Sequence, residues 1–407
     1  MTAFAAQSPS SASDKQIFIP SYNPDELKNV RTWEKTWAGQ KIDNTNVQQI
    51  KDFLLGPQIN LLSKPELMRE EHYWFEIVSY REAIYSRGQL EMTRSYAPSA
   101  KLDGDMLANY ANIAGFPFPW PVSGIEAAYN FDMQTRGDSR NDVFVGYTVE
   151  PDTGIAKKNS KRQTDMFWTG RTYANPYPRF SPNPKGYRRT IFTKMLEPPA
   201  MADAGILEIR YNDFEREDDE WFWMPQYRRI RRISRAQSGQ NVRGTEQLRE
   251  DKDGWFTHIN RNNYQLLGRK ELLLVRHQDV SSIRWTKGSG VYNGLQRERI
   301  KTFEIEAVPK DSSYTYSRQL WYLDPEQWHI LVKLCWDRND NLWRCNENFY
   351  QKSTTVNGEY AYCSAGTMNL NVMTPHASIG IVTEVKNVSK NFPSKIFSIN
   401  SLQKMAY

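Results

Sequence analysis

The sequence is poor in the residues that most often build catalytic and metal sites. Among its 407 residues are only five histidines and three cysteines. It has no G-x-S-x-G nucleophile elbow, no phosphate-binding P-loop and no G-x-G-x-x-G turn. The histidines show no metal-ligand spacing and are scattered at His72, His258, His277, His329 and His376. The sequence therefore predicts a protein without metal, cofactor or catalytic residues.

Long apolar runs and a strong charge of one sign are also missing. No stretch approaches the roughly 18 to 20 apolar residues that cross a bilayer, so no membrane-spanning helix is expected. The 53 basic and 47 acidic residues leave a net charge of +6 and a pI near 8.9. This balance is too weak to indicate nucleic acid, and we expect no nucleic-acid partner.

The three cysteines lie in the last quarter of the chain. Cys335 and Cys345 flank a predicted hairpin, so their sulfurs are expected to be neighbours across the two strands. A disulfide between them would suit an oxidising compartment. A pairing of Cys345 with Cys363, and three unpaired thiols, are the open alternatives.

The N-terminus has one feature of a processed export signal. Ala3-Phe4-Ala5 has the small-x-small form of a signal-peptidase site, although no basic and apolar segment precedes it. We interpret it as the end of a removed signal peptide with a restored Met1, and a coincidence of composition is the alternative. Residues 1–15 are expected to form a flexible mature N-terminus.

Aromatic residues make up 13% of the chain, and this enrichment favours strands. Helices are expected at 46–55, where Gly56-Pro57 ends the pattern, and at 103–114. Alternate prolines break regular structure in 115–124, and 151–154 is typical of a hairpin turn. From residue 141 onward we expect an antiparallel meander, with strands near 143–150, 155 onward, 206–211, 220–224, 227–233, 264–267, 271–277, 299–308, 318–323, 329–336, 342–349 and 360–363.

Apolar and charged residues alternate along these strands, which gives the sheet one apolar face and one solvent-exposed face. Phe303, Ile305 and Ala307 alternate with Glu304 and Glu306. The apolar face must be covered by a helix, a second sheet or a hydrophobic ligand. Leaving a few hundred Å² of it in water costs several kcal/mol at about 25 cal/mol per Å², so an open apolar groove would imply a partner.

An acidic run and a basic run flank an aromatic strand in residues 211–236. The acids from Glu215 to Glu220 precede Trp221-Phe222-Trp223-Met224, and Pro225 then forces a turn or a sheet edge. Beyond Pro225 apolar residues recur every third position, which we interpret as a bulged strand. The arginines between them either pair with the acids or contact a phosphate, a lipid headgroup or a partner; they are Arg228, Arg229, Arg231 and Arg232.

Four motifs resemble those of a bacterial family called domain of unknown function 1329, which is related to outer-membrane lipoprotein-sorting proteins. They cover roughly residues 100 to 345: GFPFP at 115–119 with GIEAAYN at 124–130, EREDDEW at 215–221 with RRIRRIS at 228–234, YQLLG at 264–268, and YSRQLWYLDPEQW at 316–328 with DR at 337–338 and LW at 342–343. The resemblance implies a periplasmic protein of a Gram-negative bacterium, with its signal peptide removed. It also implies two partners, an inner-membrane resistance-nodulation-division exporter and an outer-membrane β-barrel protein, and it implies no catalytic residues.

We therefore expect a mainly β fold with some α structure. A large curved antiparallel sheet, or incomplete β-barrel of the lipoprotein-carrier type, should have helices and loops filling or capping its concave face. The expected division is a flexible N-terminus at 1–15, a helical and irregular region at 16–125, the half-barrel at 126–350 and a C-terminal extension at 351–407.

The leading hypothesis is a periplasmic carrier or adaptor for a hydrophobic molecule or lipid, working with an envelope transport system. A structural protein that docks on a membrane export complex without cargo is the alternative, and an enzyme acting on lipid or glycan is the third. Each predicted lining residue has ordinary core packing as its alternative role. Residues predicted to line the site are Trp221, Trp223, Met224, Tyr264, Leu266, Trp321, Tyr322 and Trp328, and those predicted to plug or gate it are Phe116, Phe118 and Trp120.

Overall fold

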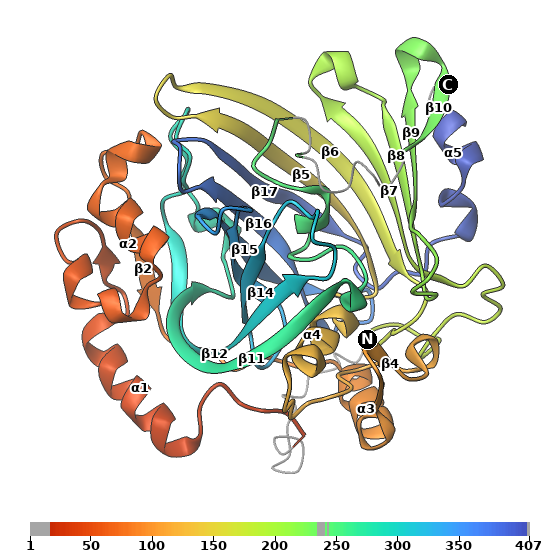
Figure 1. Cartoon of the computed structure of the whole chain (residues 1–407), viewed down its shortest axis with the longest axis horizontal. Coiled ribbons are helices and arrows are strands. Elements are labelled where there is room, and N and C mark those ends of the chain that lie inside the picture. The colour runs from red at the N-terminus through yellow and green to blue at the C-terminus, as the bar shows by residue number, and fades with distance from the viewer. Residues whose placement is uncertain (1–16, 234–240, 242–243, 405–407) are drawn as a thin grey trace, which may run out of the picture.

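One open sheet of fifteen strands forms the framework of the computed structural model (Figure 1). The structure describes residues 17–233, 241 and 244–404. Neighbouring strands follow the order β1-β2-β12-β13-β14-β15-β16-β17-β5-β6-β7-β8-β9-β10, and β11 pairs with β12. Within these residues the end strands β1 and β10 do not pair with each other, so the sheet curves without closing into a barrel. The predicted mainly β fold is confirmed.

The elements have the following bounds. The strands are β1 (Lys41–Ile42), β2 (Phe75–Val78), β3 (Leu102–Asp103), β4 (Met106–Leu107), β5 (Ser139–Glu150), β6 (Ile155–Phe167), β7 (Tyr187–Glu197), β8 (Gly205–Tyr211), β9 (Asp219–Met224), β10 (Arg229–Ile233), β11 (Asn262–Val275), β12 (Leu295–Pro309), β13 (Arg318–Leu323), β14 (Ile330–Trp336), β15 (Leu342–Thr354), β16 (Tyr360–Asn371) and β17 (Ala377–Lys386). The α-helices are α1 (Pro24–Trp37), α2 (Gly56–Ser63), α3 (Arg87–Tyr96), α4 (Gly124–Met133) and α5 (Ile399–Lys404).

Two runs of consecutive strands meet in the middle of the sheet. The run β5 to β10 joins the run β12 to β17 through the antiparallel pairing of β17 with β5, in which Ala377 lies opposite Val149. The pairing of β2 with β12 is parallel, and the other strand pairings are antiparallel. Strands β16 and β17 lie beyond residue 350, so the boundary predicted there does not coincide with an edge of the sheet.

Helix α4 covers the apolar part of the concave face. Ser123 begins it by accepting a hydrogen bond from the Glu126 amide, as an N-cap serine does. The buried Ala127 and Phe131 belong to the same core cluster as the apolar residues of β12 and β13. Gly124 allows the helix to approach β11, because a Cβ there would lie 2.8 Å from the backbone of Gln265.

The chain ends pack on other parts of the sheet. The N-terminal helices α1 and α2 flank one side of it (Figure 1), and Leu61 and Leu62 join a core cluster with Phe349 of β15. At the opposite side, Phe397 and Leu402 of the C-terminal segment pack in one cluster with Trp223 of β9.

The helix predicted at 46–55 is wrong. The structure has two short 3-10 turns there, Val47–Gln49 and Lys51–Phe53, and α2 begins at Gly56, where the predicted helix should end. Pro57 lies in the first turn of α2, where its missing N–H costs no hydrogen bond. Gly-Pro therefore starts a helix at this point instead of ending one.

The helix predicted at 103–114 is also wrong. Strands β3 and β4 pair there, and a 3-10 turn follows at Tyr110–Asn112. Gly104 and Asn109 have φ values of 58° and 57°, and a left-handed conformation interrupts an α-helix.

The predicted hairpin at 151–154 is confirmed, since β5 and β6 pair across it. The bulge predicted in β10 is wrong: β10 pairs with β9 in unbroken register, from Arg229 opposite Met224 to Ile233 opposite Glu220. The interruption in the sequence pattern falls in the preceding turn, where Arg228 adopts a φ of 48°.

Candidate functional site

Residues 244–261, here called the strap, lie against the concave face of the sheet. On the apolar side of that face, Trp255 and Ile259 are buried in the cluster that contains α4. The rings of Trp255 and Trp321 are 5.7 Å apart. This end of the strap is thus held by apolar packing.

The other part of the strap is held by charge. Lys333 Nζ of β14 lies 2.5 Å from an Asp251 carboxylate oxygen, and neither side chain is exposed. Arg344 of β15 lies 2.9 Å from Glu246. Each of these strap carboxylates therefore meets a cation that projects from the sheet.

A third strap carboxylate enters a buried charge network on β5, β6 and β7. Asp253 lies 2.7 Å from Arg189, which also contacts Asp165 at 2.5 Å, and Arg140 contacts Asp165 at 3.0 Å. Burial alone would raise the pKa of Asp165, but Arg189 and Arg140 lower it below its usual value. Burial likewise opposes ionisation of Asp253, and the surrounding arginines, Arg136 first, hold its pKa well below the usual range. Both groups stay ionised, so they are anchors and not proton donors at neutral pH.

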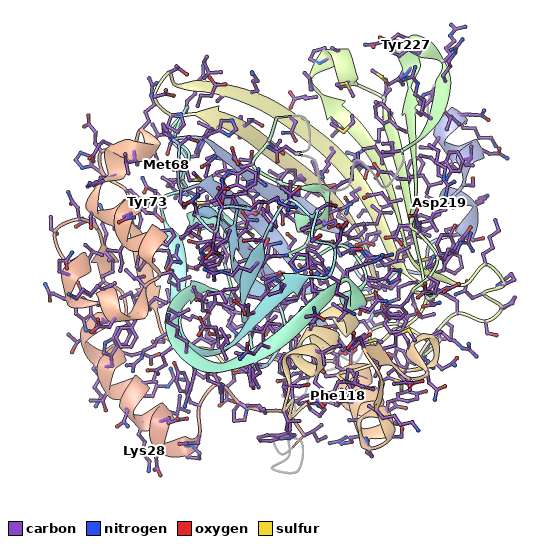
Figure 2. The ribbon with its side chains drawn as sticks, in the orientation of Figure 1. Lys28, Met68, Tyr73, Phe118, Asp219 and Tyr227 are labelled. Carbon is purple, nitrogen blue, oxygen red and sulfur yellow. The ribbon has the colours of Figure 1, made fainter. Side chains whose placement is uncertain are left out.

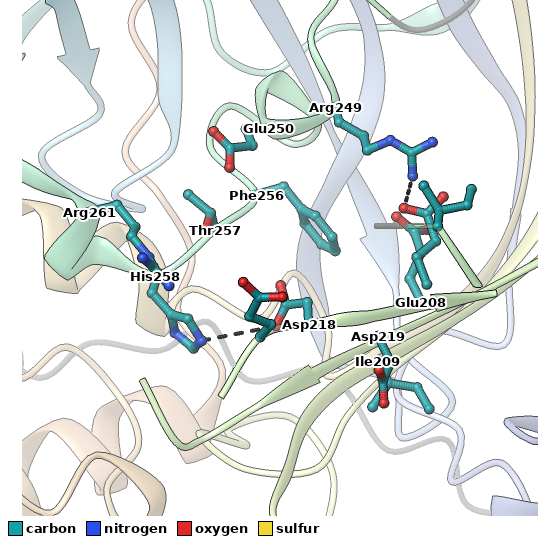
Figure 3. Close-up of a pocket in the computed structure, with 13 residues that line it drawn as sticks. Glu208, Ile209, Asp218, Asp219, Arg249, Glu250, Phe256, Thr257, His258 and Arg261 are labelled. Atoms are coloured by element: carbon teal, nitrogen blue, oxygen red, sulfur yellow. Dashed lines mark ion pairs between the residues drawn. The ribbon is translucent and has the colours of Figure 1, made fainter. Parts of the chain in front are cut away.

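A pocket lies between the strap and strands β8, β9 and β10, which we call the wing (Figure 3). Its cavity volume is about 80 Å³, and the cavity opens into about 690 Å³ of surrounding space that includes open solvent. Its lining combines apolar side chains with charged ones: Glu208, Ile209, Glu217, Asp218, Asp219, Glu220, Ile233, Arg249, Glu250, Phe256, Thr257, His258 and Arg261.

Ion pairs across the pocket join the strap to the wing. Lys252 lies 2.5 Å from Glu208, and Arg249 pairs with Glu220. Phe256 stands among cations, with the Arg210 guanidinium 4.3 Å from its ring centre. Chemically, the pocket offers an apolar wall with a charged rim in which six carboxylates outnumber two arginines and one histidine, and this suits an amphipathic ligand better than a purely apolar one.

The predicted lining residues do not line this pocket. Alternation on β9 places Trp221 and Trp223 on the face that packs against the C-terminal segment, whereas their neighbour Glu220 faces the pocket. Tyr322 belongs to a different core cluster from its neighbour Trp321. Met224 is half-buried and Trp120 is 56% exposed. Tyr264, Leu266, Trp328, Phe116 and Phe118 pack in the cluster around α4 (Phe118 is labelled in Figure 2). Ligand contact by these residues stays a prediction.

The four arginines of the basic run separate into two groups. Arg232 pairs with Asp219 and lies over the Trp221 ring, so pairing with the neighbouring acids is confirmed for this residue. Arg228, Arg229 and Arg231 are exposed. Two acids of the run pair with cations outside it: Asp218 lies 3.3 Å from Arg210, and Glu220 pairs with Arg249.

The predicted disulfide is wrong, because all three cysteines are free and buried. Cys335 lies opposite Arg344, and Cys345 lies opposite Leu334. This offset of one residue sends the two sulfurs to opposite faces of the sheet. Cys363 pairs with Gln351, far along β15 from Cys345, so the alternative disulfide is also absent.

Other kinds of site are not seen in the described part of the chain. It contains no group of three or more His, Cys, Asp or Glu side chains placed to hold a metal ion. Within the same ranges, no helix has the length and apolar character needed to span a membrane.

The sequence does not predict the strap as a unit. Its only signal was the interleaving of Glu246, Glu250, Asp251 and Asp253 with Trp255 and Phe256 in a segment without strand or helix periodicity.

Several solved structures are similar to this chain at low sequence identity. A putative outer membrane lipoprotein-sorting protein domain from Vibrio parahaemolyticus has 14% identity and a TM-score of 0.49, with 69% of this chain and 98% of that chain covered. A DUF1329 family protein from Desulfovibrio piger has 15% identity and a TM-score of 0.48, with 68% and 95% covered. A LolA superfamily protein from Nitrosomonas europaea has 12% identity and a TM-score of 0.43, with 69% and 100% covered.

No curated protein matches the sequence. The model of the family "Protein of unknown function (DUF1329)" matches residues 41–403, which is most of the chain, and the protein belongs to this family.

Proposed function

We propose that this protein is a periplasmic binding or carrier protein for a hydrophobic molecule or lipid, and that its ligand enters between the strap and the wing. The pocket at this place carries the proposal. Ile209, Ile233 and Phe256 provide apolar contact, and the charged residues around them provide a polar rim. An amphiphile has the same division between an apolar chain and a polar head.

Deeper entry would require the strap to leave the charged part of the concave face. Its carboxylates cover Lys333, Arg344 and Arg189. Uncovering buried cations without a replacement costs several kcal/mol for each broken pair. A ligand with an anionic head, such as a phosphate or carboxylate, would supply that replacement, whereas a neutral hydrocarbon would not. We therefore favour an acidic amphiphile as the cargo of this deeper site, where its head would meet the cations under the strap and not the carboxylates of the outer pocket.

The family resemblance supports the cellular setting of this proposal. It implies an exported protein that works beside a resistance-nodulation-division exporter in the inner membrane and a β-barrel protein in the outer membrane. The small-x-small tripeptide at Ala3-Phe4-Ala5 is in keeping with export. A binding function, and not catalysis, is what we propose in this setting.

A ligand extraction tests the proposal. The full chain would be purified from periplasm without detergent, and an organic extract of it examined by mass spectrometry. We expect a stoichiometric amphiphile in the wild-type extract. Titration with N-phenylnaphthylamine, a fluorescent apolar probe, then measures the affinity of the emptied protein.

Two matched variants locate the site. Ile233→Asp places a charge in the pocket wall, and Ile155→Asp makes the same change at a 46% exposed position at the start of β6. We expect about tenfold weaker probe binding for Ile233→Asp, because a carboxylate is costly against an apolar ligand, and unchanged binding for Ile155→Asp. Wild-type protein that carries no amphiphile and binds no probe would contradict the proposal, as would equal losses in both variants.

A structural adaptor without cargo is the second candidate function, and one observation favours it. Most of the predicted lining residues are packed core, and the strap and α4 cover the face that a cargo would occupy. An empty extract together with stable co-purification of a membrane export complex would support this function over the carrier.

A further inference from the structure

Two hairpin turns of the sheet project beyond the rest of the molecule at the upper right of Figure 1. One joins β7 to β8 through the 3-10 turn Pro199–Met201, and the other joins β9 to β10 through Pro225–Tyr227. Gln226 ties them together by donating a hydrogen bond of 2.6 Å to the carbonyl oxygen of Ala200. We call these two turns, with Arg228, Arg229 and Arg231, the tip.

The charge at the tip is positive and uncompensated. Arg228, Arg229 and Arg231 are exposed, and in the residues that the structure describes no ion pair to any of them is found. The acids near the first turn are already neutralised, since Asp203 lies 2.6 Å from Lys194 and Glu197 lies 2.7 Å from Lys158. The sequence from Tyr227 to Arg243 contains no Asp or Glu.

Apolar and aromatic groups accompany these arginines. Tyr227 is 65% exposed at the outer end of the wing, where Figure 2 labels it. Pro198, Pro199 and Ala200 are exposed in the adjoining turn. Tyrosine with arginine is the combination that suits the headgroup layer of a bilayer, because the ring is amphipathic and the guanidinium fork binds phosphate.

We propose that the tip binds the surface of a membrane that contains anionic phospholipid. Alternation along β10 places Arg229 and Arg231 on the same face as Ile233, which lines the pocket. A membrane held by these arginines would therefore face the pocket side of the wing. The inference does not depend on which cargo the pocket takes, or on whether it takes one.

Vesicle sedimentation tests the inference. The full chain would be mixed with sucrose-loaded vesicles of phosphatidylcholine with phosphatidylglycerol, or of phosphatidylcholine alone, at low and high salt. We expect binding to the anionic vesicles only, and weaker binding at high salt, because exposed charges are screened. Replacing all three arginines in R228Q/R229Q/R231Q should weaken binding roughly a hundredfold, since each contributes about fivefold near an anionic surface.

A control variant separates the tip from net charge. R87Q/R284Q/R338Q removes three exposed arginines on other elements and lowers the net charge equally. We expect it to bind anionic vesicles within about twofold of the wild type, with unchanged thermal midpoints for both triple variants. The inference is overturned if the wild type ignores anionic vesicles, if it binds neutral vesicles equally well, or if the control loses as much binding as the tip variant. Probe binding in the pocket is measured separately, so either proposal can fail alone.

Discussion

Replacing Lys333 with methionine tests whether charge anchors the strap. Lys333 donates to Asp251 at 2.5 Å and to the carbonyl oxygen of Gly254 at 2.7 Å, both in the strap. Methionine fills a similar volume but leaves the Asp251 carboxylate buried without its cation. Two donors remain for that carboxylate, the Tyr316 hydroxyl at 2.7 Å and the Leu248 amide at 2.9 Å.

Removing one partner of a buried ion pair costs about 3 to 5 kcal/mol, and the two remaining donors favour the lower end of that range. An unfolding entropy of about 2.1 cal/mol/K per residue gives roughly 0.85 kcal/mol/K for this chain length. A loss of about 3 kcal/mol should therefore lower the thermal midpoint by about 4 °C. Hydrogen exchange of the strap amides should become faster, with little change in β12 to β16.

A double-mutant cycle supplies the decisive comparison. Adding Asp251→Asn removes the stranded charge while keeping an acceptor for Tyr316, so the double variant should be more stable than Lys333→Met alone. Lys310→Met is the control: it breaks a partly exposed pair with Asp105, and we expect a loss of under about 1 kcal/mol. Free energies of unfolding in urea give the four corners of the cycle. The reasoning is refuted if the losses of the two single variants simply add, or if Lys333→Met is as mild as the control.

Three further predictions concern acid stability, the core and the thiols. Burial opposes ionisation of Glu298, yet His277 and nearby arginines lower its pKa from the usual 4.5 to about 2. Because this pKa is depressed on folding, the stabilisation is complete above pH 4.5 and is lost as the pH falls toward 2. This stabilisation amounts to about 3 kcal/mol. Between pH 4.5 and pH 2, the free energy of unfolding of Glu298→Gln in urea should therefore change less with pH than that of the wild type. Trp321→Ala should lower the free energy of unfolding in urea by about 3 to 5 kcal/mol, and Trp120→Ala by less than about 0.5, because only Trp321 is buried. Equal losses would contradict the assignment of Trp321 to the core and of Trp120 to the surface. Burial raises the pKa of Cys335 to about 12, so a thiol reagent should label no cysteine in the native protein and three in denaturant; only one labelled thiol after unfolding would indicate a disulfide.

Much of the sheet could be predicted because its strands alternate in the ordinary way. β13 runs from Arg318 to Leu323 as expected, and β12 extends the predicted 299–308 by a few residues at its ends. Strand β7 was missed because Arg188, Arg189 and Lys194 interrupt its apolar pattern. In the structure these charges do not prevent burial of the strand, because Arg189 is buried and paired with Asp165.

The candidate site was less predictable for a related reason. A single sequence indicates which residues alternate, but not which of two faces of a strand will be covered by a distant segment. Bulk and strand propensity predict that Trp221 and Trp223 line a cavity, and in the structure both pack against the C-terminal segment. The pairing of Asp251 with Lys333, which are 82 positions apart, has no local signal at all.

The charged strap changes what a carrier of this shape would have to do. An apolar lid is released when an apolar ligand replaces its contacts, because the ligand and the lid make the same kind of contact with the sheet. Here Glu246, Asp251 and Asp253 cover cations, and a neutral hydrocarbon that displaced them would leave those cations buried and unpaired. An anionic headgroup would avoid that cost. The tip arginines, on the same face as the pocket wall at Ile233, would hold such headgroups close to the place where the strap meets the wing. If both proposals hold, anionic amphiphiles should bind more tightly than neutral ones of equal chain length, and Lys333→Met should narrow that difference.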